Sequence, residues 1–206
     1  MKKGIFILLV FILLFGLFGC DTTNSSNNPV NNEEENKENP VINSEDNKTI
    51  VIYFSRTNNT EKIAEHIINL TKADKYEIEA KIPYSDADIN YGNSNSRTSL
   101  EQNDPQARPE IAGSSIDLSK YKIIYLGYPI WWGQAPKIMY TFVESYDLNG
   151  KTIIPFCTSG SSLIGTSATN LAKLSTGANW LTGKRFSASA TVNEIESWIK
   201  TLNLGE

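Results

Sequence analysis

The chain of 206 residues is 40% hydrophobic, carries a net charge of −4, and contains only two cysteines and one histidine. With so few thiols and imidazoles, a disulfide framework, a metal cluster and a His-dependent catalytic triad are all poor hypotheses. The acidity belongs to residues 21–47, because residues 49–206 carry 15 basic and 16 acidic side chains. This near-neutral balance, without a basic cluster, gives no support for binding nucleic acid.

The N-terminal segment has the pattern of an export signal. Lys2 and Lys3 precede an uninterrupted apolar run over residues 4–19, and Cys20 ends it. The run is slightly short for a membrane-spanning helix, which needs roughly 17 to 25 residues. The last four residues of the segment resemble a bacterial lipoprotein signal, which implies cleavage before Cys20 and lipidation of that cysteine. Because Phe18 is bulky for this motif, an uncleaved anchor stays open, and either form predicts attachment to the cell membrane on its extracytoplasmic side.

Residues 21–47 are dominated by Asn, Glu, Ser and Asp and contain almost nothing apolar. Such a composition cannot bury enough surface to offset the entropy of ordering the chain. We therefore interpret residues 1–20 as the signal peptide and residues 21–47 as a disordered tether. Residues 48–206 are predicted to form one folded domain, which is long enough for a sizeable core.

Within that domain, short apolar runs alternate with helical stripes, which predicts an α/β fold with a parallel sheet and helices on both faces. The second strand alternates in polarity and suits a sheet edge. We interpret His66 as a partly exposed residue of the first helix, Cys157 as a buried strand end, and the apolar stripe of the last helix, which begins at Val192, as core packing. Strands are expected at residues 50–54, 75–80, 122–127, 152–157 and about 181–186, and helices at about 60–70, 136–143 and 192–202.

Residues 81–120 differ from the rest of the domain because they contain few apolar residues and no sustained period. An irregular segment of that length inside a compact domain is usually functional or mobile. Several of its side chains are candidates for folding over a neighbouring site, and the pattern does not decide among them. They are Pro83, Tyr84, Tyr91, Arg97 and Arg108.

Three loops that follow predicted strands carry unusual chemistry, and in an open parallel sheet ligands bind beyond the carboxyl ends of the strands. The loop after the first strand offers hydroxyl and amide donors at a helix N-terminus, which suits a terminal phosphate, although an ordinary helix cap is the alternative. The loop after the third strand holds two tryptophans that cannot both be buried in the sheet core, so that one suits a planar aromatic ligand; the alternative is a surface or interface patch. The loop after the fourth strand is rich in backbone donors free of bulky side chains, with a plain strand-to-helix cap as the alternative. The candidate residues are Ser55, Arg56, Thr57, Asn58, Asn59 and Thr60, then Pro129, Ile130, Trp131, Trp132 and Gly133, then Thr158, Ser159, Gly160, Ser161 and Ser162.

The loop over residues 55–60, Ser-Arg-Thr-Asn-Asn-Thr, is similar to the phosphate-binding turn of flavodoxins, Ser/Thr-x-Thr-Gly-Asn-Thr. Asn58 stands where that turn has glycine, a tolerable change because asparagine enters left-handed conformations more readily than most residues. With all three loops in this order, the domain resembles a flavodoxin. The resemblance implies a three-layer α/β/α sandwich with a five-stranded parallel sheet in the order 2-1-3-4-5, and FMN as the cofactor. It also implies that residues 129–133 cover one face of the flavin ring and that residues 158–162 contact its pyrimidine edge.

The residues leave the kind of flavoprotein open. Flavodoxins that only carry electrons are typically strongly acidic and have an aromatic residue on each side of the flavin, whereas this domain is nearly neutral and has no aromatic residue in its third loop. One ring face is therefore expected to be open or covered only by the segment near Tyr84 and Tyr91. An open face favours FMN-dependent reduction of a small molecule such as a quinone, with no side chain nominated as catalytic, and electron carriage stays open.

A second class of function also stays open, namely a flavin-free, surface-tethered module that binds a ligand or a protein through its tryptophan loop. A phospho-acceptor receiver domain is disfavoured, because the first predicted strand is not followed by acidic residues and the third does not end in Asp. The sequence names neither an electron donor nor an acceptor. Because Lys2 and Lys3 are not a twin-arginine signal, we expect export of the unfolded chain and uptake of FMN outside the cytoplasm.

Overall fold

The computed structural model describes residues 48–204. The expected signal peptide, the lipidation site Cys20 and the tether lie outside the described residues, and they stay predictions. Within residues 48–204, none of the helices is both long and apolar enough to cross a bilayer.

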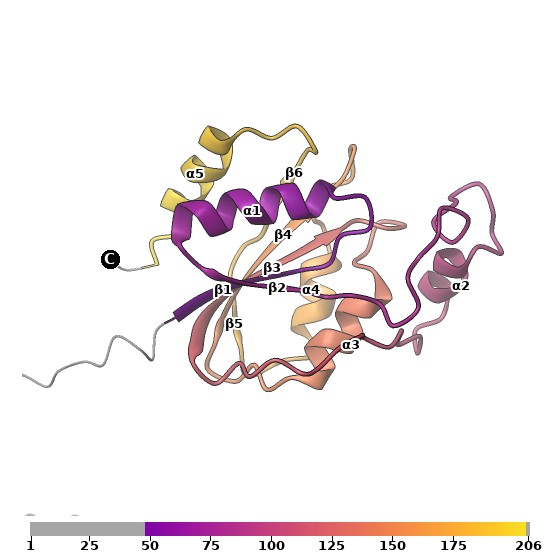
Figure 1. Cartoon of the computed structure of the whole chain (residues 1–206), viewed down its shortest axis with the longest axis horizontal. Coiled ribbons are helices and arrows are strands. Elements are labelled where there is room, and N and C mark those ends of the chain that lie inside the picture. Colours follow the sequence, from indigo (N-terminus) through magenta and orange to yellow (C-terminus); the bar gives the residue numbers. More distant parts are fainter. Residues whose placement is uncertain (1–47, 205–206) are drawn as a thin grey trace, which may run out of the picture. The chain divides into compact units, whose positions relative to one another are not determined.

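The domain is built on a parallel sheet whose strands follow the order β2-β1-β3-β4-β5, with β6 also paired to β4 (Figure 1). This order and the parallel pairing confirm the predicted fold, and β2 takes the predicted edge position. The strands are β1 (Lys48–Tyr53), β2 (Asp74–Glu77), β3 (Tyr121–Pro129), β4 (Thr152–Thr158), β5 (Asn179–Trp180) and β6 (Lys184–Phe186).

The fifth strand was expected as one piece, but it is broken into β5 and β6. Leu181 donates its N–H to the carbonyl of Ile153, so every second residue of β4 from Ile153 onward faces the fifth strand. Pro155 is the next of these residues, and it has no N–H to donate to the ladder. The interruption between Trp180 and Lys184 therefore lies opposite the position where β4 lacks a donor.

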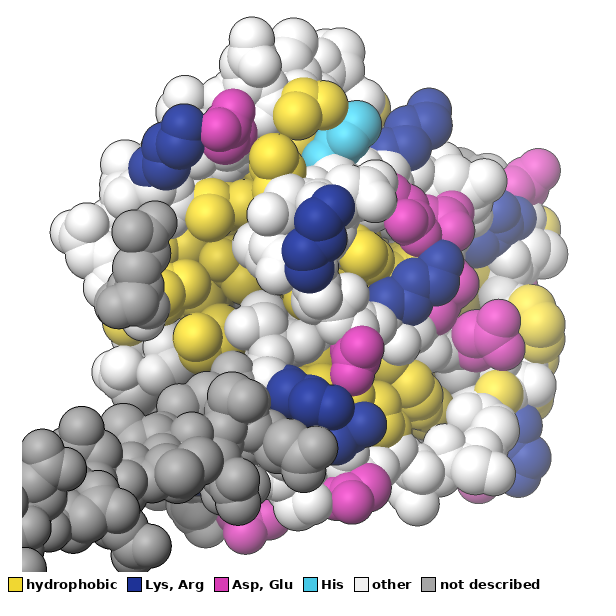
Figure 2. Space-filling view, turned by 60° about the vertical axis from the view of Figure 1, so that its left-hand side comes forward, with side chains coloured by type: hydrophobic (Ala, Val, Ile, Leu, Met, Phe, Trp, Pro, Cys, Tyr) yellow, Lys and Arg dark blue, Asp and Glu magenta, His cyan; other side chains and the backbone are white. Residues whose placement is uncertain are grey.

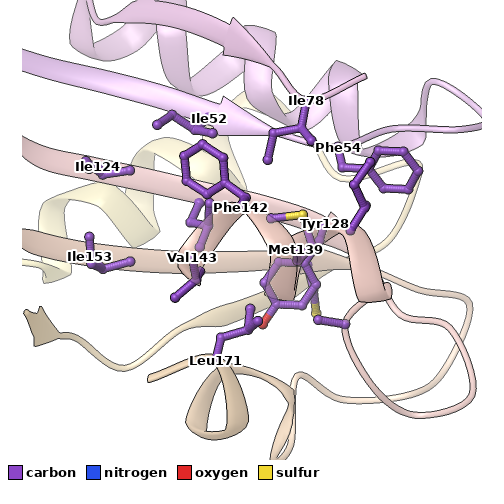
Figure 3. Packing of buried hydrophobic residues seen from close by; sticks show 14 of the residues in the cluster. Ile52, Phe54, Ile78, Ile124, Tyr128, Met139, Phe142, Val143, Ile153 and Leu171 are labelled. Atoms are coloured by element: carbon purple, nitrogen blue, oxygen red, sulfur yellow. The ribbon is translucent and has the colours of Figure 1, made fainter. Parts of the chain in front are cut away.

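Helices cover both faces of the sheet, as the alternation along each strand requires. Val51 and Tyr53 point to the face covered by α1 (Asn59–Thr71) and α5 (Val192–Thr201), whereas Ile50 and Ile52 point to the face covered by α3 (Lys137–Ser145) and α4 (Ser167–Ala172). Figure 3 shows the second of these cores, in which Phe142 and Val143 of α3 and Leu171 of α4 meet the strands.

Two short helices were not predicted, because neither has an apolar period to reveal it. In α2 (Arg97–Asn103), which lies within the segment interpreted as irregular, the buried residues are the polar Thr98 and Ser99. In α4 they are Ser167 and Leu171. The second strand is also shorter than the predicted range of residues 75–80, because β2 ends at Glu77. Ala80 instead forms an isolated antiparallel bridge with Ile111.

Other details bear on single residues. His66 is half-buried and Cys157 is buried, as expected. The interpretation of Val192 as a core residue is wrong, because its side chain at the start of α5 is 42% exposed.

Lys and Arg side chains are interspersed with Asp and Glu side chains on the face shown in Figure 2, in keeping with the nearly neutral charge of this part of the chain.

In the segment over residues 81–120, the part around α2 lies beyond the carboxyl ends of the central strands (Figure 1), and other residues bond to α3. Arg108 forms a two-pronged ion pair with Glu144 of α3, with nitrogen to oxygen distances of 2.5 and 2.8 Å. Gln102 donates to the carbonyl of Ala135 at 3.1 Å, and the Thr141 hydroxyl donates to the carbonyl of Pro109 at 2.9 Å. An ion pair and hydrogen bonds therefore hold this segment against α3 and the residues just before it.

Candidate functional site

The turn between β1 and α1 has the local geometry of an anion site. Asn58 lies in the left-handed region at φ 59°, as expected for an asparagine in place of a glycine. The Ser55 hydroxyl accepts a hydrogen bond from the Glu61 N–H at 3.3 Å, and the Asn59 amide donates to the Thr57 hydroxyl at 3.2 Å. Among the described residues, no hydrogen bond uses the backbone N–H groups of residues 57–60. Four donors are thus free at the positive end of a helix, which fits a phosphate group.

Two of the predicted site residues, Thr60 and Thr158, hold the first and third loops together. Their hydroxyl oxygens lie 2.7 Å apart, and both side chains are buried. The Ile130 N–H donates to the carbonyl of Thr158 at 2.9 Å, which joins the second loop to the same point. The structure therefore brings all three predicted loops to one edge of the sheet.

Arg56 is the member of the first loop that turns away from it. Its guanidinium donates to the carbonyl of Tyr84 and to the Asp86 carboxylate, the latter at 2.7 Å. Arg56 thus links the first loop to the segment over residues 81–120 and does not join the free N–H groups.

The second loop is a two-residue hairpin that separates the roles of its tryptophans. Trp131 and Gln134 exchange two backbone hydrogen bonds of 2.9 Å, and Trp132 and Gly133 between them have φ of 47° and 75°. Positive φ at both central positions is the pattern of a type I′ turn, and it is uncommon for a residue as bulky as tryptophan. Half-buried Pro129 ends β3 just before this turn. Loop geometry of this kind cannot be inferred from composition alone.

Trp131 belongs to the core. Its side chain is only 5% exposed, and its ring packs edge-on against Phe54 at 5.5 Å and Tyr84 at 5.2 Å between centroids. Trp132 is half-buried and stacks on Tyr91 with centroids 4.3 Å apart and an angle of 28°. The expectation that the sheet core would not bury both tryptophans is confirmed, and Trp132 is the one at the surface.

Tyr84 and Tyr91 of the long segment both contact this loop region, a placement that the sequence did not decide. The Tyr84 hydroxyl donates to Glu101 at 2.8 Å, and the Arg97 guanidinium lies 3.9 Å from the centre of the Tyr84 ring. Burial, and then the Glu101 carboxylate, raise the pKa of the Tyr84 phenol, so it stays protonated as a donor. Tyr91 donates to the carbonyl of Ile130 at 3.4 Å.

The third loop is held from behind by Arg185 of β6, which sequence reasoning missed. The Arg185 guanidinium donates to the Ser159 hydroxyl at 3.2 Å and to the carbonyls of Ser159 and Gly160, each at 2.6 Å. The Ser159 hydroxyl donates to the carbonyl of Ser162. Gly160, Ser161 and Ser162 are exposed. The only signal for Arg185 was a basic pair in a short strand, whose pairing with the end of β4 could not be known.

Cys157 lies one residue before the third loop. Burial raises the pKa of its thiol to about 12, so the reactive thiolate is scarce at neutral pH. The fully buried side chain packs within the sheet.

A family model for flavodoxins matches residues 48–202. The chain belongs to the flavodoxin family. A crystal structure from Bacteroides eggerthii DSM 20697, provisionally assigned as a flavoprotein, is 39% identical with a TM-score of 0.72, covering 77% of this chain and 99% of that one. A second, from Bacteroides uniformis ATCC 8492, has the same identity and TM-score and covers 75% and 98%.

A structure with lower sequence identity shows a likeness in fold alone. A flavoprotein from Lactobacillus acidophilus NCFM, solved in complex with FMN, is 21% identical with a TM-score of 0.56, covering 74% of this chain and 99% of that one. No curated protein matches the chain. The three-layer flavodoxin-like architecture predicted from the sequence is thus confirmed.

Proposed function

We propose that the domain binds FMN and acts in electron transfer or in the reduction of a small molecule. The observation that carries the proposal is the first turn, where a left-handed Asn58 and four free N–H groups lie at a helix N-terminus beside two further loops. The cofactor supplies the redox chemistry, and the protein supplies binding and electrostatics. Family membership supports this assignment, as does the fold shared with the Lactobacillus protein that was solved with FMN.

Each loop receives one part of the cofactor in this proposal. Residues 57–60 bind the phosphate through their N–H groups, Trp132 lies against one face of the ring, and residues 159–162 meet the pyrimidine edge. Trp132 takes the role at the ring because Trp131 is enclosed by Phe54 and Tyr84.

Reduction of a small molecule, such as a quinone, is the more specific form of the proposal. It is supported by the exposure of Gly160, Ser161 and Ser162 and by the absence of an aromatic side chain from this loop, which leave room beside the ring. The nearly neutral charge of residues 49–206 also offers no strong field for docking a charged redox partner. Rapid reduction of a soluble quinone by the reduced protein, compared with slow transfer to a protein acceptor, would support the reductase.

The first experiment is an FMN titration of residues 48–206 followed by absorption and by tryptophan and flavin fluorescence. Tight uptake with quenched flavin emission is the expected result, and loss of that quenching in Trp132→Ala, with uptake retained, would assign the ring contact. A protein that takes up no FMN at concentrations far above micromolar would overturn the redox proposal and leave a flavin-free binding module.

We also propose that the domain is lipid-anchored through Cys20 on the extracytoplasmic side of the cell membrane. The support is the charged and apolar N-terminal pattern followed by a cysteine. Full-length protein labelled with a fatty acid analogue should carry the label and fractionate with membranes, and Cys20→Ala should lose the label. Labelling that persists in Cys20→Ala would contradict the assignment of Cys20.

A further inference from the structure

The third loop differs from the other two because the guanidinium of the partly buried Arg185 bonds its backbone. One terminal nitrogen of Arg185 bonds the carbonyls of both Ser159 and Gly160, and the Nε atom bonds the Ser159 hydroxyl. Within the part of the chain that the structure describes, no carboxylate lies within ion-pair distance of Arg185. No carboxylate among the described residues therefore pairs with the positive charge of Arg185 beside this loop.

Because the peptide bond is planar, the carbonyls that Arg185 holds fix the directions of the N–H groups that follow them. In a trans peptide the N–H points opposite to the preceding carbonyl. Because Arg185 holds the carbonyls of Ser159 and Gly160 to one side, the N–H groups of Gly160 and Ser161 project to the other side. Neither N–H donates to any group among residues 48–204, and a Cβ at Gly160 would meet nothing within 4 Å. The loop thus presents two adjacent donors toward open space, with a cation behind them.

We infer that Arg185 is a positioning residue that aims these two N–H groups at the pyrimidine edge of the flavin and raises its reduction potential; this inference rests on the proposed FMN site. Addition of two electrons and one proton to the neutral flavin ring leaves one negative charge, which is shared by the pyrimidine edge. Two fixed N–H donors and a positive charge favour that anionic product over the neutral oxidised ring. In the experiment below, dithionite supplies the electrons and is added stepwise until the chosen solution potential is reached.

Three variants separate the charge of Arg185 from its geometry. Arg185→Gln removes the charge and the fork, Arg185→Lys keeps the charge and loses the fork, and Lys184→Gln removes one charge from the neighbouring position. Lys184 is a matched control because its ammonium lies over the Phe186 ring at 5.3 Å and bonds no atom of the third loop.

The measurement is the FMN dissociation constant together with the ratio of reduced to oxidised flavin at a fixed solution potential. Arg185→Gln should weaken FMN binding about tenfold and lower the ratio by about tenfold or more, the scale of a lost charge-assisted hydrogen bond. Arg185→Lys should lose affinity but keep most of the ratio, and Lys184→Gln should change neither. A role limited to packing would lower affinity without moving the ratio.

The outcomes separate this inference from the proposed function. Wild-type protein that takes up no FMN overturns both. Wild-type uptake with an unchanged ratio in Arg185→Gln overturns only the role of Arg185, as does an equal shift in Lys184→Gln. If circular dichroism shows that Arg185→Gln does not fold, the test rests on Arg185→Lys. A ratio of reduced to oxidised flavin in Arg185→Lys as low as that of free FMN overturns the effect of the charge. A retained ratio with weaker FMN binding supports it.

Discussion

The turn after β1 and the segment over residues 81–120 are both polar and irregular, yet they are held in different ways. The turn obeys local rules, with a left-handed Asn58 and a helix N-terminus that follows at once. The segment is held by contacts between residues far apart in the chain, such as Arg108 with Glu144 and Tyr91 with Trp132. The conformation of the turn thus depends on a few adjacent residues, whereas the conformation of the segment depends on the whole fold.

The two regions meet at Trp131, so replacing this residue should disturb both. Its ring packs against Phe54, which directly follows β1, and against Tyr84 of the segment. Trp131→Ala should lower the free energy of unfolding by about 3–5 kcal/mol, the usual cost of removing a buried large aromatic side chain. Urea denaturation followed by circular dichroism measures this.

Trp132→Gly is the matched control for that substitution. It loses a stacked pair worth about 0.5–1.5 kcal/mol and relieves a left-handed backbone position, so its net effect should stay below about 1 kcal/mol. Equal destabilisation by the two variants would contradict the assignment of Trp131 to the core.

The hydroxyl pair of Thr60 and Thr158 tests how firmly the first turn is tied to the third loop. Thr60→Val leaves the buried Thr158 hydroxyl without its partner and should cost about 1–3 kcal/mol of unfolding free energy. The double variant with Thr158→Val removes both polar groups at similar volume and should be less destabilised than the sum of the single variants. Strict additivity would show that the two hydroxyls do not interact.

Prediction from sequence succeeded where local rules operate. The strand order, the three loops at one edge, the conformation of Asn58 and the burial of Cys157 all follow from patterns within a few residues or from the resemblance they support. Helix α2 was not predicted, because its buried residues are the polar Thr98 and Ser99, which give no apolar period. The break in the fifth strand depends on the missing N–H of Pro155 in a neighbouring strand, which no local pattern in residues 179–186 reveals.

Within the candidate site the same division holds. The free N–H groups of the first turn could be expected from a helix start. In contrast, the packing of Trp131 on Tyr84, the stacking of Tyr91 on Trp132 and the hydrogen bonds from Arg185 to the third loop each join residues at least 25 positions apart. Their sequence signals are isolated aromatic or basic residues, which also occur on ordinary protein surfaces.

The left-handed conformation at Asn58 tests the turn after β1 alone, because it depends only on neighbouring residues. Asn58→Val places a β-branched side chain at φ 59° and should cost about 1–2 kcal/mol of unfolding free energy. Asn58→Gly accepts the same backbone freely and should be neutral within about 0.5 kcal/mol. Thermal denaturation of both variants, without and with FMN, measures the effect, and the FMN-dependent gain in stability should shrink only for Asn58→Val. A tolerated valine would mean that the turn rearranges.

The smallest expected effect concerns the segment alone, at the ion pair of Arg108 and Glu144. Both side chains are partly exposed, so Arg108→Ala should cost at most about 1 kcal/mol at pH 7. The Arg108 hydrogen bond holds the pKa of Glu144 below its usual value near 4.5, so the carboxylate adds stability above that value and loses it as the pH falls through the lower folded pKa. The difference between wild type and Arg108→Ala should therefore be largest at neutral pH and shrink below about pH 4.5. Lys81→Ala, which removes an exposed pair with Glu110 in the same segment, should show almost no difference at any pH. A difference for Arg108→Ala that grows in acid would contradict the role of the ion pair in holding the segment to α3.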